Sequence, residues 1–336
     1  MTLLPADATR TVIITHRGYR SYLPACLRRA CASNPDGRVV LLGDEASASI
    51  GIGEHHDIDQ PELQEDLDEF RRIYKCRSRS QGYLFERGCL ERWFVIRNFM
   101  RREKLRGCLA IDSDVLLFCN VPEESLRFRS YAMTFGRWDA VRVVPHCNFI
   151  RGIEGIESFC EYVLELYRNQ DALERIAAIN RKKYDSSWIS DMSLLASWGA
   201  LGTFPVGFLE DTVAQGVGFD ACLDAPDVYE PCSFFPGVLK PWKKITFRDG
   251  LPYAKVRGSG LEVPFRCLHY HGRMKQLIDR HDKTMSDDIH AAKILLSKKL
   301  FTFPSKIQLF CKNYIASPLA RASVVERLAL AGWFPK

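Results

Sequence analysis

Two aspartates, one residue apart, interrupt an apolar stretch near the middle of the chain. Cys-Leu-Ala-Ile (108–111) precedes Asp112-Ser113-Asp114, and Val-Leu-Leu-Phe (115–118) follows. Charged groups are costly to bury unless they are paired or bound to a metal. In open α/β sheets, ligands bind at the carboxyl ends of the strands, where two carboxylates can hold a hard divalent cation together with phosphate oxygens. The alternative is a cap or turn without a ligand.

A second group of residues that could bind a metal or a phosphate lies far along the chain. His269 ends an apolar run, and Gly272 and Lys275 follow it at intervals of three. Histidine adds a nitrogen ligand to a metal held by carboxylates. Glycine lets backbone amides approach a phosphate, and lysine offers it a point charge. His271 is the alternative ligand, and a histidine without any metal is the alternative to both.

The elements that position these residues alternate between strand and helix. An apolar strand (11–15), a helix (22–32) and a second strand (38–44) form a βαβ unit, which predicts a parallel sheet. Apolar spacing predicts further helices. The other predicted elements are helices 61–74, 88–103 and 155–168, strand 108–111, a hairpin over 244–256, strand 265–271, and two tail helices that begin near Ser286 and Ser317.

Composition indicates a soluble globular protein with a sizeable core. The chain has 336 residues, of which 46% are hydrophobic and 26% charged. Apolar runs stay shorter than the roughly 18 residues of a membrane span, and we expect no signal peptide. The 12 cysteines form no Cys-x-x-Cys pair. Free thiols in a reducing cytosol are therefore expected.

The positive charge is concentrated in the tail. The net charge is +6, and from residue 289 onward eight basic residues stand against one acidic residue. This pattern predicts contact with an anionic surface and no nucleic-acid partner. An apolar stripe and the terminal Trp333 and Phe334 allow peripheral binding to an anionic membrane. Docking of the same stripe on the catalytic domain is the alternative.

Together these motifs resemble the GT-A class of nucleotide-sugar glycosyltransferases. The pattern is most similar to the retaining glycogenin and lipopolysaccharide galactosyltransferase family. The resemblance implies a Rossmann-like mixed sheet flanked by helices over residues 1–278. It places a nucleotide half at about 1–118 and an acceptor half at about 119–278. Residues 279–336 are then a basic helical extension that the resemblance does not cover.

The resemblance also implies roles for the two motifs. In that family, Asp-x-Asp and the histidine bind Mn²⁺ on the donor diphosphate, and the glycine and lysine contact that diphosphate. Carried over, Asp112, Asp114 and His269 become the metal ligands. Gly272 and Lys275 become contacts to the diphosphate.

Other family positions have counterparts in this chain. The arginine on the helix before Asp-x-Asp corresponds to Arg92, with Arg97 as the alternative. Asn148 corresponds to an asparagine that touches the donor sugar, and Asp191 to the first acid of an Asp-Gln-Asp motif beside it. The residues predicted to bind the nucleotide are Thr15, His16, Asp44 and Ser113.

The chain also departs from the family pattern. Gln276-Leu277 replaces the usual Pro-Trp after the lysine, and the small-residue motif after the asparagine is absent. These departures bear on the particular family more than on the class.

The expected function is transfer of a hexose from a nucleotide-sugar, preferably a UDP-sugar, to a glycan or lipid-linked glycan. We expect a retaining, cytoplasmic enzyme of bacterial surface polysaccharide synthesis, with a peripheral position at the inner face of the plasma membrane as a further expectation. If the reaction inverts, Asp191 is the candidate base. The alternatives are a phosphohydrolase of the haloacid-dehalogenase type and a non-catalytic module that binds nucleotide-sugars.

Overall fold

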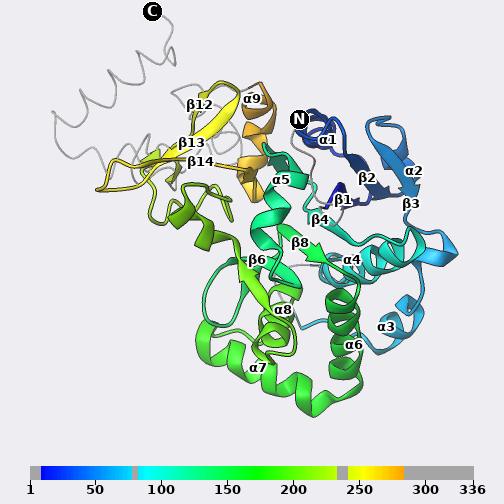
Figure 1. Ribbon diagram of the computed structural model, residues 1–336. Helices are drawn as coiled ribbons and strands as arrows, with labels where there is room; N and C mark the ends of the chain where they lie inside the picture. Colours follow the sequence, from blue (N-terminus) through cyan, green and yellow to red (C-terminus); the bar gives the residue numbers. More distant parts are fainter. Residues whose placement is uncertain (1–8, 78–81, 233–240, 284–336) are drawn as a thin grey trace, which may run out of the picture.

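The computed structural model describes residues 9–77, 82–232 and 241–283. Its largest sheet consists of β1 (Thr11–His16), β2 (Arg38–Gly43), β3 (Glu54–Asp57), β4 (Gly107–Ile111), β6 (Met133–Arg137), β7 (Val143–Val144), β8 (Cys147–Arg151) and β9 (Val206–Phe208). The strand order is β3-β2-β1-β4-β8-β6-β7, and β9 pairs with β6 (Figure 1). The pairs from β3 to β4 are parallel, whereas β4 and β8 are antiparallel. The predicted fold class, a mixed sheet flanked by helices, is confirmed.

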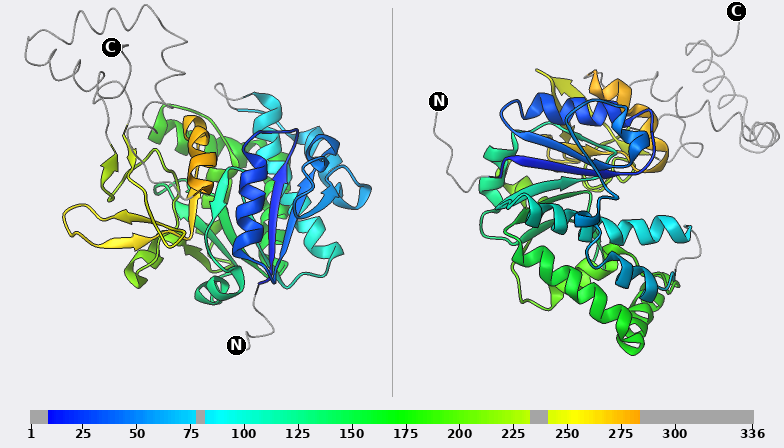
Figure 2. Two further views of the ribbon diagram at one scale, coloured as in Figure 1. Left: turned by 90° about the horizontal axis from the view of Figure 1, so that it is seen from above. Right: turned by 90° about the vertical axis from the view of Figure 1, so that its right-hand side faces the viewer.

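Helices cover both faces of this sheet because successive strand residues point to opposite sides. Val12 and Ile14 pack in the core beneath α1 (Leu23–Ser33). Ile13 belongs to the core on the other face, where α4 (Tyr83–Arg102) and α6 (Glu154–Arg168) lie. Figure 2 shows α1 on one side of the strands and α4 and α6 on the other.

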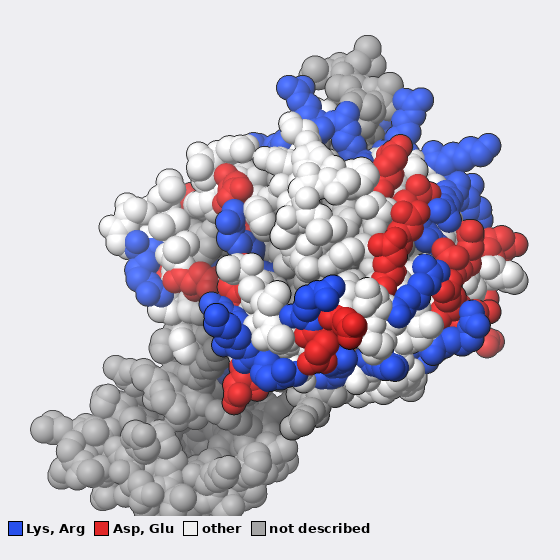
Figure 3. Space-filling view, turned by 90° about the horizontal axis from the view of Figure 1, so that it is seen from below, with Lys and Arg blue, Asp and Glu red and all other residues white. Residues whose placement is uncertain are grey.

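The other helices that flank the main sheet lie on both of its faces, because their buried residues are divided between the core around Ile13 and the core around Val12. They are α2 (Glu45–Ala48), η1 (Pro61–Leu63), α3 (Leu67–Ile73), α5 (Val121–Ser125), η2 (Leu126–Phe128), α7 (Gln170–Tyr184), α8 (Asp191–Ala200) and η3 (Leu209–Gln215). Acidic and basic side chains alternate on the face shown in Figure 3. Surface pairs such as Arg168–Glu69, at 2.6 Å, join neighbouring helices, although each contributes only about 1 kcal/mol or less.

A smaller assembly packs against the carboxyl side of the main sheet. In it, β5 (Val115–Leu117) pairs with β15 (Cys267–His269). Trp242, Phe265 and Tyr270 fill a separate core there. The other elements are β10 (Pro231–Cys232), β11 (Trp242–Lys243), β12 (Thr246–Arg248), β13 (Leu251–Lys255), β14 (Glu262–Pro264), η4 (Gly272–Leu277) and α9 (Ile278–Asp282), with α9 lying beside α1 (Figure 1).

The structure corrects several predicted boundaries. The predicted helix 61–74 is divided into η1 and α3, because Asp66 adopts a positive φ of 65° between them. The predicted helix 88–103 begins five residues earlier, at Tyr83. The predicted strand 265–271 is reduced to Cys267–His269. The two predicted tail helices lie outside the described residues.

Candidate active site

The apolar run around the two aspartates is not one continuous strand. β4 ends at Ile111, the chain turns through Asp112 and Asp114, and β5 then leaves the main sheet to pair with β15. In this antiparallel pair His269 stands opposite Val115. The pairing therefore brings a histidine from the end of the described chain beside acids more than a hundred residues earlier. We call Asp112, Asp114 and His269 the acidic site.

Hydrogen bonding fixes which ring nitrogen of His269 faces the acids. Nδ1 lies 2.6 Å from the carbonyl oxygen of Ala221, which can only accept a hydrogen bond, so Nδ1 carries the proton. Nε2 consequently presents its lone pair. It lies 3.6 Å from Asp114 Oδ1 and 3.9 Å from Asp112 Oδ2. An oriented imidazole and two carboxylate oxygens fit a divalent cation.

Each carboxylate of the acidic site also has a cationic partner on its other oxygen. Arg92 donates to Asp112 Oδ1, and the Lys275 ammonium lies 2.8 Å from Asp114 Oδ2. Burial raises the pKa of Asp112, but the neighbouring Arg92 guanidinium opposes it most strongly, and this pKa is lowered overall. For Lys275, burial lowers the pKa, and the attraction of Asp114 more than compensates. Both carboxylates of the acidic site thus keep one oxygen directed at His269.

Arg92 connects the acidic site to Asp191. Its Nη2 lies 2.7 Å from Asp191 Oδ2. Asp191 is the first residue of α8, where Ser190 forms a capping box. Burial raises the pKa of Asp191, and Arg92 only partly opposes this. Arg97, the alternative arginine, pairs instead with Asp66 at 2.9 Å, and Arg92 is therefore the arginine beside the acids.

Asn148 lies on β8, opposite Ala110 of β4. Its Nδ2 donates to the carbonyl oxygen of Pro145 at 3.0 Å, and Arg92 donates to the same oxygen at 3.1 Å. The side chain is buried, and its Oδ1 has no hydrogen-bond partner among the described residues. Asn148 thus lies next to the Arg92–Asp191 pair, with an unused acceptor.

The predicted nucleotide residues lie at the carboxyl ends of β1, β2 and β4. His16 Nδ1 lies 2.8 Å from Ser113 Oγ, which links the first strand to the acidic site. Asp44 caps α2 and also accepts the backbone N–H of Gly18 at 2.7 Å. Thr15 precedes His16 in β1, paired with Leu42 of β2.

Gly272 follows β15 in the left-handed region that favours glycine, with φ of 56°. A Cβ at this position would meet no atom within 4 Å. The constraint here is therefore conformational, and the surrounding space stays open beside Lys275.

The sequence did not predict the residues that fix the position of His269 through hydrogen bonds and ring stacking. Asp220 accepts the His269 backbone N–H at 3.0 Å and pairs with Lys243 at 2.8 Å. Both members of this ion pair are buried, with side chains 0% and 2% exposed. The His146 ring stacks on that of His269, 4.9 Å between centroids. These contacts join distant parts of the chain, so no local spacing signals them.

No family model matches this chain, and no curated protein matches it in sequence. Solved structures of glycosyltransferases resemble it at low identity. Mouse xyloside xylosyltransferase 1 is 11% identical, with 61% of this chain and 86% of that one covered and a TM-score of 0.44. WbbM, a bifunctional glycosyltransferase, is 12% identical over 87% of this chain and 52% of that one, with a TM-score of 0.42. An active-site mutant of LgtC is 12% identical over 78% and 87%, with a TM-score of 0.39.

Identities and TM-scores this low transfer neither residue roles nor activity. The function below is therefore argued from the side chains of this chain.

Proposed function

We propose that this protein is a metal-dependent glycosyltransferase that uses a nucleotide-sugar donor. One observation carries the proposal. The Nδ1–H of His269 is committed to a carbonyl oxygen, so Nε2 faces one oxygen from each of Asp112 and Asp114. Such a set of one nitrogen and two oxygens, at the carboxyl end of a central strand, suits a cation that also binds a diphosphate.

Asp112, Asp114 and His269 would hold Mn²⁺ or Mg²⁺. When bound, the cation neutralises negative charge that develops on the departing diphosphate. Lys275 and the backbone at Gly272 bind the same diphosphate and stabilise it further. Arg92 keeps Asp112 ionised and correctly oriented. The residues Thr15, His16, Asp44 and Ser113 lie where the nucleoside would bind.

Asp191 and Asn148 are proposed to position the donor sugar. Both lie next to Arg92, which pairs with Asp191 and shares the Pro145 carbonyl oxygen with Asn148. If the reaction retains the anomeric configuration, as the resemblance implies, no strong protein base is required. If it inverts, Asp191 is our candidate base. Its raised pKa reflects burial and is a property that general bases often share.

The finer parts of the proposal rest on the sequence resemblance. It favours a UDP-sugar, a hexosyl group, and a glycan or lipid-linked glycan acceptor of bacterial surface polysaccharide synthesis at the cytoplasmic face of the membrane. A phosphohydrolase of the haloacid-dehalogenase type is less consistent with the geometry. That type carries its acids on the first strand, whereas here they follow β4.

A thermal-shift panel tests the proposal. A ligand that binds only the native state raises Tm. We expect a UDP-sugar to do so with Mn²⁺ present, and GDP- and CMP-sugars to have little effect. Slow Mn²⁺-dependent hydrolysis of the donor would separate an enzyme from a binding module. Hydrolysis of simple phosphate esters instead would favour the phosphohydrolase, and no effect of any nucleotide-sugar would remove the proposal.

We further propose that the basic tail binds anionic membrane. No helix among the described residues is long and apolar enough to cross a bilayer. Each basic residue near an anionic surface contributes about 1 kcal/mol. In flotation at low salt, vesicles with anionic lipid should carry the full chain upward. A full-length variant with Lys298, Lys299 and Lys306 changed to glutamine should float less. Equal flotation of the two would remove the membrane proposal without affecting the catalytic one.

A further inference from the structure

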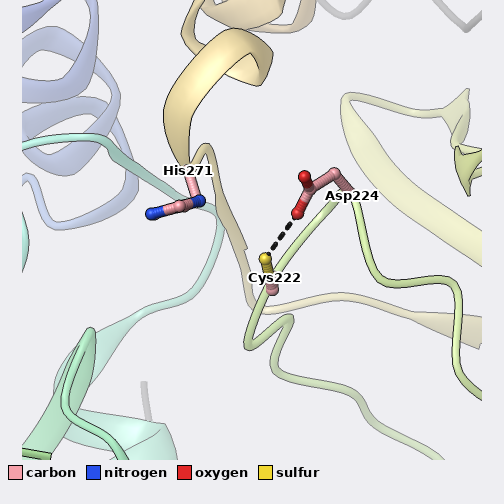
Figure 4. A group of neighbouring side chains, drawn as sticks. All are labelled: Cys222, Asp224 and His271. Atoms are coloured by element: carbon pink, nitrogen blue, oxygen red, sulfur yellow. Dashed lines mark hydrogen bonds between the residues drawn. The ribbon is translucent and has the colours of Figure 1, made fainter. Parts of the chain in front are cut away.

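A second cluster of potential metal ligands lies on the loop that supports His269. Cys222 and Asp224 belong to the segment between η3 and β10, and His271 immediately precedes η4. One donor atom from each of the three residues lies within 4.8 Å of the other two. In Figure 4 the Cys222 thiol and the Asp224 carboxylate face each other, and His271 lies beside them. We call these residues the thiol site.

Hydrogen bonds within the protein position the backbone of the thiol site without any ion. The buried Lys243 ammonium donates to the carbonyl oxygen of Cys222 at 2.7 Å, and the Lys243 N–H donates to that of Leu223 at 2.8 Å. Leu223 N–H in turn donates to the carbonyl oxygen of His269 at 3.1 Å. The loop that carries Cys222 and Asp224 is thus tied both to β11 and to the strand that leads to His271.

The donor set differs in kind from that of the acidic site. A sulfur, an oxygen and an imidazole nitrogen suit Zn²⁺, whereas two carboxylates and an imidazole suit Mn²⁺ or Mg²⁺. Cys222 is buried, Asp224 is half-buried and His271 is exposed. Three protein ligands with one side open to solvent match the arrangement of zinc sites that keep a fourth position for water or another ligand.

The distance between Cys222 and Asp224 allows such an ion after a small adjustment. The Cys222 thiol donates to Asp224 Oδ1 at 2.8 Å. Tetrahedral Zn²⁺ with ordinary Zn–S and Zn–O bonds separates the two atoms by about 3.5 Å. An ion bound by both atoms would therefore replace the thiol proton that they now share. Binding breaks the S–H bond, forms a Zn–S bond and releases the proton to solvent.

We propose that Cys222, Asp224 and His271 form a Zn²⁺ site that is separate from the acidic site. The two sites are close neighbours, because the rings of His269 and His271 lie 6.5 Å apart. His271, considered from the sequence as an alternative ligand of the acidic site, is thereby assigned to a different cation. This assignment does not depend on the proposed transferase activity.

Cobalt spectroscopy tests the proposal without an activity assay. The reduced, chelator-treated full chain is titrated with Co²⁺, which substitutes for Zn²⁺. Coordination by a thiolate gives a charge-transfer band in the near ultraviolet, whereas an oxygen-rich site gives none. We expect a band that saturates at one equivalent, disappears on addition of one equivalent of Zn²⁺, and survives in the Asp112→Asn/Asp114→Asn double variant.

Substitutions locate the band. It should be lost in Cys222→Ser and lost or strongly weakened in His271→Ala, whose exposed position keeps the fold intact. The half-buried Cys31 and His55 supply matched controls, and Cys31→Ser and His55→Ala should retain the band. No band in the wild type, or a band that persists in both Cys222→Ser and His271→Ala, would overturn the proposal.

Discussion

The acidic site and the thiol site have the same number of side chains and lie side by side, but they are built in opposite ways. At the acidic site both carboxylates are paired with cations, Arg92 and Lys275. They lie just after the carboxyl end of the central strand β4. At the thiol site Cys222 and Asp224 pair with each other on a loop. Donor type and electrostatic support, more than ligand number, therefore distinguish the two.

The two sites nevertheless have one feature in common, a basic side chain that binds the groups supporting the ligands: half-buried Arg92 at the acidic site and buried Lys243 at the thiol site. Arg92 lies between Asp112 and Asp191, and Lys243 lies between Asp220 and the Cys222 carbonyl oxygen. Removing one partner of a buried ion pair leaves a charge without compensation. Substitution of either basic residue should therefore destabilise the protein to a similar extent, even though the ligands of the two sites differ.

The largest expected effect is the loss of stability when either Arg92 or Lys243 is removed. Arg92→Gln and Lys243→Gln should each lower the free energy of unfolding by about 3–5 kcal/mol, measured by urea denaturation. The exposed pair Arg17–Asp59, with side chains 46% and 54% exposed, supplies the control. Arg17→Gln should cost less than about 1 kcal/mol. Equal costs for all three variants would contradict the shared design.

Activity should separate the two sites clearly. Asp114→Asn weakens a ligand set worth several kcal/mol in the transition state, so donor turnover should fall by roughly a hundredfold or more. Asp224→Asn, an equivalent change at the thiol site, should alter turnover in Mn²⁺ by only a few-fold. Similar losses in both variants would mean that the thiol site takes part in transfer.

Lys275→Ala should weaken binding of the nucleoside diphosphate. A hydrogen bond to a charged group is worth about 1.5–3 kcal/mol, which corresponds to roughly a 10- to 150-fold rise in Kd by titration calorimetry. Arg273→Ala, two residues earlier in η4, tests whether the charge of Arg273 also contributes to binding of the diphosphate. An unchanged Kd in Lys275→Ala would remove that residue from the diphosphate site.

The smallest effects should come from replacing each of the two histidines with alanine. His269→Ala should raise the Mn²⁺ concentration needed for half-maximal activity by about tenfold or more, in the range typical of lost metal-site groups. His271→Ala should leave that concentration unchanged. The reverse result would mean that the histidine next to the acids is not the one that binds the metal.

Several features of this protein follow from local sequence alone. The βαβ unit over residues 11–43 and the place of Asp112 at a strand end were predicted, because apolar periodicity and turn residues act over short distances. The spacing of Gly272 and Lys275 after His269 was likewise predicted, since His269 ends β15 and the other two residues lie in η4 shortly after it. Local signals were weaker at boundaries, as the division of helix 61–74 at Asp66 shows.

Tertiary structure decided which distant groups meet. Pairing of β5 with β15 sets His269 opposite Val115 and leaves His271 beyond the strand end. The Arg92–Asp191 pair spans about a hundred residues, and Lys243 supports Cys222 from another strand. Sequence spacing carries no record of such contacts, because they arise only when strand pairing and burial bring separate segments together. The types of ligand were therefore written in the sequence, and their division between two sites was determined by the fold.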